Sequence, residues 1–166
     1  YLAAIINNPS IEFVWFGDES LGEMWEKGFY APYPMKLPED RVFKPYAKQD
    51  IVTLFCPNTI KKNALNQLFA VALLQRKHRE LILHTNVPID PAFAKSINLK
   101  YVQHGWLQDQ EYKSLIASSK LNFACSWAET LHYGSVEAAL QGTASIMSAT
   151  VPWSHAKCVI NPNSPI

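Results

Sequence analysis

From Asp50 onward, short apolar segments alternate with longer amphipathic ones, and this alternation constrains the fold more than any other feature of the sequence. The short segments carry apolar residues on both faces, as strands do when helices cover both sides of a sheet. They span residues 51–56, 80–85, 99–105, 121–126 and 144–148. The segments between them predict helices over residues 61–78, 91–96, 108–119 and 133–141. Such a βαβ series predicts an α/β fold with a mostly parallel sheet covered by helices on both faces.

The first 49 residues do not follow this pattern. Residues 1–10 resemble the end of a helix, and residues 11–18 predict a strand closed by turn residues. The stretch 29–50 is rich in proline, which disfavours a continuous helix or a central strand, so we interpret it as an extended linker. We therefore expect residues 1–49 to be the tail of an amino-terminal half plus this linker. Residues 50–166 would then form a domain that is truncated at its carboxyl terminus.

Charge and cysteine content narrow the function classes. With 15 basic and 14 acidic residues, the chain carries no broad field that would attract nucleic acid. Each of its three cysteines lies in or beside an apolar run, which favours buried free thiols and a reducing, cytoplasmic compartment. No apolar segment approaches the roughly 20 residues that span a bilayer. The histidines and cysteines lack the spacing of a zinc motif, so we expect no metal.

Ligands of open α/β sheets bind where the carboxyl ends of the strands lead into the next helices. The informative loops are therefore residues 57–60, 84–87, 104–107 and 126–132. None of them contains the Gly-x-Ser-x-Gly elbow of a serine hydrolase or the phosphate loop of a nucleotidase.

The last of these loops belongs to the stretch WAETLHYGSVEAALQG, which holds Glu129 and Glu137. On one continuous helix, the two carboxylates would lie about 80° apart in azimuth and about 12 Å apart along the axis, so they could not meet. With Glu129 in the loop and Glu137 in the first turns of the helix, both can line one elongated ligand. The helix N-terminus between them would offer N–H groups to a phosphate. The alternative is that Glu129 is a solvated loop acid and Glu137 merely a favourable acid near a helix start.

The order of elements around these glutamates resembles a known family. It is similar to the carboxyl-terminal, nucleotide-sugar-binding half of retaining glycosyltransferases of the GT-B kind, of group 1 or family 4 type, whose hallmark is two glutamates separated by seven residues. The segment EAALQG resembles the family's Glu-Ala-(Met/Leu)-Ala-x-Gly. The resemblance covers approximately residues 51–160. It implies a Rossmann-like, doubly wound sheet that forms one half of a GT-B fold.

The resemblance also implies roles for the residues of this stretch. Glu137 would accept hydrogen bonds from the ribose hydroxyls of the donor, and Glu129, as a catalytic residue, would contact the hydroxyls of the donor sugar. The diphosphate would lie on the backbone of Thr130, Leu131, His132, Tyr133 and Gly134. The family has Gly-Phe-Gly where this chain has Thr130, Leu131 and His132. Gly134 could restore some backbone freedom, and His132 could either donate to a phosphate oxygen or only fill space.

The loop after the strand 51–56 carries a second part of the resemblance. Lys62 aligns with a family lysine that neutralises the leaving diphosphate, and Asn63 continues the common Lys-Asn pair. Pro57 stands where the family has an arginine. Lys61, or the side chains of Asn58 and Thr59, could compensate for that cation. The alternative for Lys61 is a solvated lysine at a helix start. Cations and N–H groups placed on the diphosphate would lower the barrier without a metal.

Two further loops are expected to contact the nucleotide. His84, Thr85 and Asn86 end a strand where the family has a glycine-rich turn, so they could face the nucleotide. The alternative is that His84 only caps the strand. Gly105, Trp106 and Leu107 occupy the loop that meets the nucleobase in the family, and they could supply backbone hydrogen bonds and apolar contact. Packing against the protein is the alternative role for Trp106.

The resemblance implies a hexosyltransferase-like enzyme of polysaccharide biosynthesis that uses a nucleotide-sugar donor, needs no cofactor and retains the anomeric configuration. The acceptor would be a glycan or a lipid-linked saccharide, recognised mainly by the missing amino-terminal domain. The isolated chain is expected to bind nucleotide weakly and transfer no sugar. Peripheral association of the full-length protein with a membrane stays open. The alternatives are a non-catalytic module that binds a nucleotide or partner, and a nucleotide-sugar epimerase on the same fold.

Overall fold

The structure is a computed structural model that describes residues 14–16, 28–30, 46–129, 132–151 and 159–160. The chain divides into two compact units, residues 1–39 and residues 40–166. In the first unit, β1 (Val14–Phe16) pairs in parallel with β2 (Gly28–Tyr30). The first of these confirms the strand predicted within residues 11–18, whereas β2 was not predicted. The expected helix end at residues 1–10 lies outside the described residues.

The second unit is built on a six-stranded sheet in which every pairing is parallel. Its strands are β3 (Gln49–Leu54), β4 (Ile82–Thr85), β5 (Tyr101–Gln103), β6 (Ser119–Ala124), β7 (Ala144–Ser148) and β8 (Val159–Ile160). Their order is β5-β4-β3-β6-β7-β8. The chain therefore builds outward from β3 to β5, returns to the other side of β3 with β6, and builds outward again. This order is that of a Rossmann-like sheet, whose switch point lies between β3 and β6.

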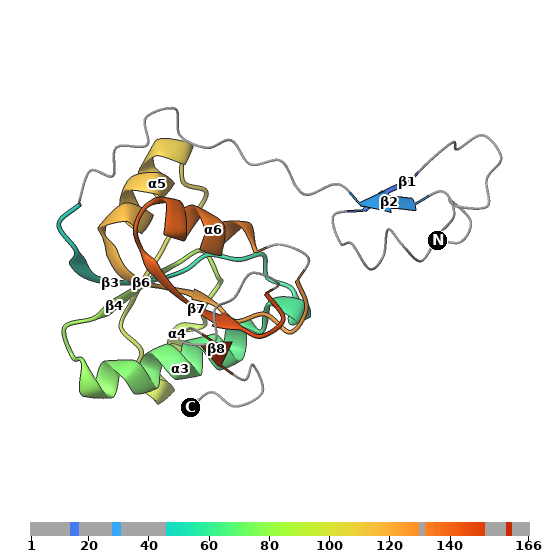
Figure 1. The fold of residues 1–166 in the computed structure, drawn as a ribbon. Helices are drawn as coiled ribbons and strands as arrows, with labels where there is room; N and C mark the ends of the chain where they lie inside the picture. The colour runs from blue at the N-terminus through green and yellow to red at the C-terminus, as the bar shows by residue number, and fades with distance from the viewer. Residues whose placement is uncertain (1–13, 17–27, 31–45, 130–131, 152–158, 161–166) are drawn as a thin grey trace. The chain divides into compact units, whose positions relative to one another are not determined.

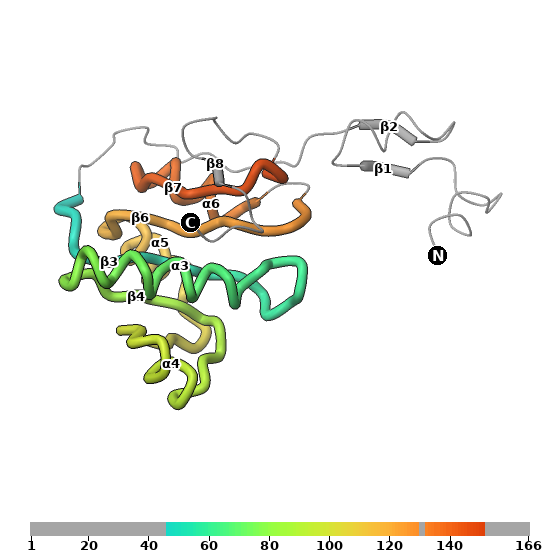
Figure 2. The backbone as a smooth tube through the Cα atoms, turned by 90° about the horizontal axis from the view of Figure 1, so that it is seen from below, coloured from blue at the N-terminus to red at the C-terminus, as the bar shows by residue number. Residues whose placement is uncertain are grey.

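Four helices cover the two faces of this sheet. In Figure 1, α3 (Ala64–Lys77) and α4 (Pro91–Ile97) lie on one side of the strands, and α5 (Asp109–Ser118) and α6 (Tyr133–Leu140) lie on the other. Figure 2, seen from below, shows α3 running along the strands and α4 beside β4. The predicted doubly wound arrangement is thus confirmed. Within the described parts of the chain, no helix is both long and apolar enough to cross a bilayer.

The main core lies between the sheet and α3. Alternate residues of β3 and β4 point into it, and Val52, Leu54 and Leu83 are at most 1% exposed. Helix α3 contributes Leu68 and Val71 to the same cluster. Burying side chains of this size stabilises the fold by about 1.5–3 kcal/mol each. Apolar residues on this face of the strands therefore specified where α3 would pack.

The opposite face of the sheet carries a row of buried polar side chains. Thr53 on β3 donates to Asn122 on β6 at 3.1 Å, and Asn122 donates in turn to Ser145 on β7 at 3.0 Å. Because each of these groups has a partner across the strands, burial under α5 and α6 costs little. The row ties the two halves of the sheet together at the switch point.

The predicted helix over residues 61–78 is shorter than expected. A 3-10 turn, η1 (Ile60–Lys62), comes first, and α3 begins only at Ala64. Between them Asn63 has a left-handed backbone with φ 53°. Asparagine tolerates this conformation, which breaks the α-helical hydrogen-bond pattern. Lys61 and Lys62 therefore lie in a 3-10 turn outside the α-helix. A continuous α-helix would have directed the Lys62 side chain elsewhere.

Candidate functional site

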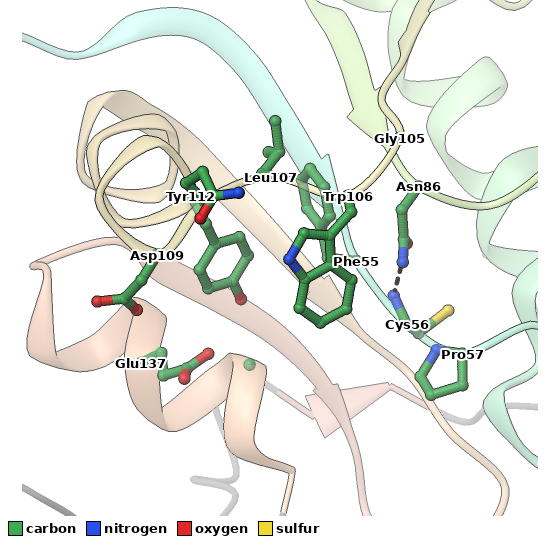
Figure 3. Close-up of a pocket in the computed structure, with 12 residues that line it drawn as sticks. Phe55, Cys56, Pro57, Asn86, Gly105, Trp106, Leu107, Asp109, Tyr112 and Glu137 are labelled. Atoms are coloured by element: carbon green, nitrogen blue, oxygen red, sulfur yellow. Dashed lines mark hydrogen bonds between the residues drawn. The ribbon is translucent and has the colours of Figure 1, made fainter.

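A pocket of about 780 Å³ opens at the carboxyl ends of β3, β4 and β5. Loop residues 55–57, 86 and 105–109 form one side, and Tyr112 of α5 with Gly134 and Glu137 of α6 forms the other. Figure 3 shows these side chains around one opening. The predicted site residues Gly105, Trp106, Leu107, Gly134 and Glu137 are thus brought together, although they come from two separate segments.

Aromatic rings supply much of the pocket wall. Phe55 and Tyr112 pack edge to face, with their centroids 5.4 Å apart. Trp106 is 93% exposed and lines the same pocket, so the alternative that it packs against the protein is wrong. A mostly apolar slot with a few polar groups suits a flat heterocycle. Phe55 and Tyr112 were not predicted as site residues, because an apolar strand end and an amphipathic helix give no sign that a ring borders a cavity.

Glu137 lies in the second turn of α6, and its carboxylate and the Tyr112 hydroxyl point toward one another in Figure 3. Burial raises the pKa of Tyr112, and the negative charge of Glu137 raises it further. The phenol therefore keeps its proton at neutral pH and can orient the carboxylate. Glu137 can accept hydrogen bonds from a vicinal diol while it stays aligned by Tyr112.

Glu129 lies in the loop after β6 and forms an ion pair with Lys62 from η1. The side chains of Lys62 and Glu129 are only 13% and 5% exposed, so Glu129 is not the solvated loop acid of the alternative interpretation. The two glutamates occupy the predicted positions, Glu129 in the loop and Glu137 in the helix. Of the two, Glu137 borders the pocket and Glu129 faces a lysine.

His132 caps the N-terminus of α6. Its Nδ1 accepts a hydrogen bond from the Ser135 N–H at 3.1 Å, and its carbonyl accepts one from the Ser135 hydroxyl at 2.8 Å. Burial lowers the pKa of His132, and Lys62 lowers it further against the opposing effect of Glu129. A neutral ring with an unprotonated Nδ1 fits the cap, which leaves Nε2 as the N–H. The imidazole is 5% exposed and does more than fill space.

Gly134 has an ordinary helical backbone inside α6, so the extra backbone freedom expected of it is not used. A Cβ at this position would lie 3.5 Å from His132 Cε1 and 3.6 Å from the Tyr112 hydroxyl. These are ordinary contact distances, so neither conformation nor space requires glycine here. Because glycine has no side chain, nothing projects from this position into the pocket.

Gln67 joins the two loops that carry Lys62 and Glu129. Its side chain is buried, donates to the Lys62 carbonyl at 2.7 Å, and accepts from the Cys125 N–H at 3.0 Å. The Trp127 N–H donates to the Lys61 carbonyl at 2.8 Å and adds a second tie. Lys61 itself is exposed. Sequence reasoning missed Gln67, since a polar residue on the buried face of a helix indicates a partner without telling which one.

His84 pairs with His104 across the ends of β4 and β5, with 3.0 Å between Nδ1 of His84 and Nε2 of His104. Burial lowers the pKa of His84, and the neighbouring His104 lowers it further. Nearby, the Asn86 side chain accepts a hydrogen bond from the Cys56 N–H at 3.0 Å, which holds the pocket edge.

The remaining predicted site residues are placed as follows. Asn63 is buried, and Tyr133 is 44% exposed at the start of α6. Thr130 and Leu131 lie outside the described residues. Among the residues that are described, no three His, Cys, Asp or Glu side chains group as metal ligands would. Cys56 and Cys125 are buried free thiols, and Cys158 is outside the described part.

No protein-family model and no curated protein matches the sequence. Solved structures do match. TarM, known from S. aureus, aligns with 99% of this chain over 36% of its own length, at a TM-score of 0.72 and 13% identity. The pneumococcal O-GlcNAc transferase GtfA, crystallised with UDP and GlcNAc, aligns with 96% of this chain over 34% of its own, at 0.70 and 12%. The catalytic domain of a cholesterol-alpha-glucosyltransferase from Helicobacter pylori aligns with 74% of this chain over 80% of its own, at 0.57 and 16%.

The chain spans about a third of the length of TarM and GtfA. Identities of 12–16% carry a likeness of fold rather than of activity. The strand order, the helices on both faces and these matches agree on one architecture. The protein has the Rossmann-like α/β fold that forms one half of a GT-B glycosyltransferase.

Proposed function

We propose that residues 50–166 bind the nucleotide end of a nucleotide-sugar donor, as the donor half of a glycosyltransferase. The observation that carries the proposal is the position of Glu137. A carboxylate on α6 borders a pocket with aromatic walls at the carboxyl ends of the strands, beside the switch point where Rossmann-like sheets bind nucleotides. The structures of TarM and GtfA that contain UDP favour a uridine nucleotide as the first candidate.

The proposed ligand runs from the Trp106 loop toward α6. The base lies in the slot formed by Phe55, Trp106 and Tyr112, where the backbone of the 105–107 loop reads its edge. The ribose diol donates to Glu137. The diphosphate continues toward Lys62 and the start of α6, and Glu129 meets the donor sugar. Asn63, Lys61 and residues 132–134 would be further donor-binding residues on this path, as the resemblance implies for Thr130 and Leu131 too, and His84 would support the loop.

The proposed chemistry is transfer of the sugar with retention and without a metal or cofactor. Departure of the nucleoside diphosphate builds negative charge, which Lys62 and helix-terminal N–H groups would stabilise. Pro57 supplies no charge where an arginine would be expected, so Lys62 carries more of this task. The acceptor would be held by an amino-terminal domain of the same polypeptide. Its expected class is a glycan or a lipid-linked saccharide. Transfer would take place in the cytoplasm or at a membrane surface.

Calorimetric titration of the 166-residue chain with UDP, GDP and their sugars tests donor binding. We expect weak but measurable binding of one nucleotide, quenching of tryptophan fluorescence, and no sugar transfer by this chain alone. Glu137→Gln should weaken binding roughly tenfold, because it removes a charged hydrogen-bond acceptor. Glu80→Gln, an exposed site remote from the pocket, serves as the matched control. Absence of heat with every nucleotide would refute the assignment.

A non-catalytic nucleotide-binding module is the second candidate. The ion pair between Lys62 and Glu129 favours it, because it occupies both groups that the transfer reaction would need. Glu129→Ala in the full-length protein separates the candidates. A donor half loses sugar transfer, whereas a binding module keeps its biological activity.

A further inference from the structure

We propose that Glu129 and His132 keep the phosphate end of the site closed, so that this chain prefers a nucleoside to its diphosphate until both contacts open. The inference rests on the proposed nucleotide site, and it concerns which part of the nucleotide the site favours. It makes His132 and Glu129 residues that determine specificity.

The charge of the open pocket is the first support. Its described lining includes the carboxylates of Asp109 and Glu137 and no lysine or arginine. The nearby Lys113 is engaged by Asp109 at 2.6 Å. A nucleoside enters this pocket without electrostatic cost, whereas a diphosphate brings two or more negative charges toward carboxylates.

The engagement of Lys62 is the second support. Lys62 is the cation expected to meet the diphosphate, and its ammonium is paired with Glu129 in surroundings that leave the carboxylate side chain 5% exposed. Gln67 holds the backbone of Lys62 and the strand end before Glu129, so both partners are kept in place. A phosphate can use this lysine only by displacing the carboxylate.

The cap of α6 is the third support. The helix N–H groups that a phosphate would use include that of Ser135, which already donates to the imidazole of His132 and to its carbonyl, at 3.1 and 3.0 Å. The Val136 N–H donates to the same carbonyl at 3.2 Å. The family pattern, with glycine at this place, has no side chain that could make this contact.

Opening the two contacts couples phosphate binding to sugar binding. When a diphosphate takes Lys62, the Glu129 carboxylate loses its partner and becomes available to the sugar hydroxyls. A donor with both diphosphate and sugar can therefore replace all the contacts that it breaks, whereas a free diphosphate cannot. The closed state thus selects against the product diphosphate more than against the complete donor.

The experiment measures the ratio of the dissociation constants of uridine and UDP for the 166-residue chain by calorimetry, with guanosine and GDP in parallel. For the wild type we expect UDP to bind no more tightly than uridine. Glu129→Gln should tighten UDP about tenfold and leave uridine unchanged, since a charged hydrogen bond no longer competes for Lys62. The double variant Lys62→Met/Glu129→Gln should return to the wild-type ratio.

Two matched controls separate this effect from general charge and from stability. Asp50→Asn also removes one carboxylate from an ion pair, with Lys120, but it lies at the opposite end of β3 and should leave the ratio unchanged. His132→Gly should tighten UDP, whereas His132→Asn, which keeps an acceptor for the Ser135 N–H, should not. Thermal unfolding confirms that each variant is folded.

The outcomes are distinguishable. If uridine binds and wild-type UDP binds more tightly than uridine, or if Glu129→Gln leaves the ratio unchanged, the closed phosphate end is refuted while the nucleotide site stands. If neither nucleosides nor nucleotides bind, the proposed function fails and the inference fails with it.

Discussion

Gln67 offers the sharpest test of how the site is held together. The substitution Gln67→Met keeps the length and approximate volume of the side chain and removes both of its hydrogen bonds. It leaves the Lys62 carbonyl and the Cys125 N–H without their partner. Gln75 provides the matched control, since it lies two turns further along the same helix, is also buried, and also binds backbone groups, the Leu81 and Lys100 carbonyls.

The expected loss of stability follows from the two groups left behind. The Cys125 N–H belongs to a residue that is 2% exposed, so leaving it unpaired costs about 1–3 kcal/mol. The Lys62 carbonyl is part-buried, and loss of its bond adds about 0.5–1.5 kcal/mol. Burial of the more apolar methionine offsets part of this cost, so we expect Gln67→Met to lower the free energy of unfolding by about 2 kcal/mol. Gln75→Met should lower it by a similar amount, because Gln75 also accepts from the Lys100 N–H at 2.9 Å.

Urea unfolding followed by circular dichroism measures both variants, and calorimetric titration with nucleotide then distinguishes them. Gln67→Met should also tighten UDP relative to uridine, since it frees the loops that hold Lys62 against Glu129, whereas Gln75→Met should leave this ratio unchanged. A decrease of less than about 0.5 kcal/mol in the free energy of unfolding for Gln67→Met would show that the Gln67 hydrogen bonds do not hold the two loops together. Equal effects of the two variants on nucleotide binding would show that Gln67 acts through stability alone.

Two other substitutions each remove one buried hydroxyl group near the end of β6 or β7. Among the residues that the structure describes, the buried Ser126 hydroxyl has no hydrogen-bond partner, so Ser126→Ala should raise the free energy of unfolding by about 1 kcal/mol. Ser148→Ala, which removes the donor to the Ser126 carbonyl at 2.6 Å, should lower it by about 1 kcal/mol in the same urea assay. Because the pKa of His132 lies below its ordinary value, the unfolded chain takes up a proton first as the pH falls below about 6.5. Through His132 alone, stability should therefore decrease between that pH and the lower folded-state pKa, by at most about 1.4 kcal/mol per pH unit. His132→Asn should reduce this slope without abolishing it, since the pKa of His84 is lowered in the same direction, and an unchanged slope would contradict the assignment.

The sequence carried most of the information about the fold, because the alternation of apolar segments depends only on which residues are buried. Each strand and helix predicted between residues 51 and 148 is present, with ends that differ by a few residues. The pocket residues Glu137 and Trp106 were also predictable, since parallel strands bring their following loops to one edge. The short β8 was not predicted, because two paired residues leave no apolar pattern.

The partners of the site residues were not predictable in the same way. Lys62 and Glu129 are 67 positions apart, and their contact depends on the left-handed turn at Asn63 and on the hydrogen bonds of Gln67. The cap by His132 depends on a rotamer at the start of α6. Apolar periodicity says nothing about either, since both are set by loop conformation and by hydrogen bonds between distant segments.

The parallel sheet also has a consequence for how the chain acquires its structure. Its two central strands, β3 and β6, meet through residues such as Thr53 and Asn122, which are 69 positions apart. Strands β3, β4 and β5 can assemble earlier, but one edge of β3 then lacks its neighbour and presents unpaired backbone groups beside an apolar core. Contacts between such distant segments form slowly. During synthesis, the interval between the appearance of β5 and that of β6 is therefore when this domain is most exposed to aggregation and most in need of a chaperone.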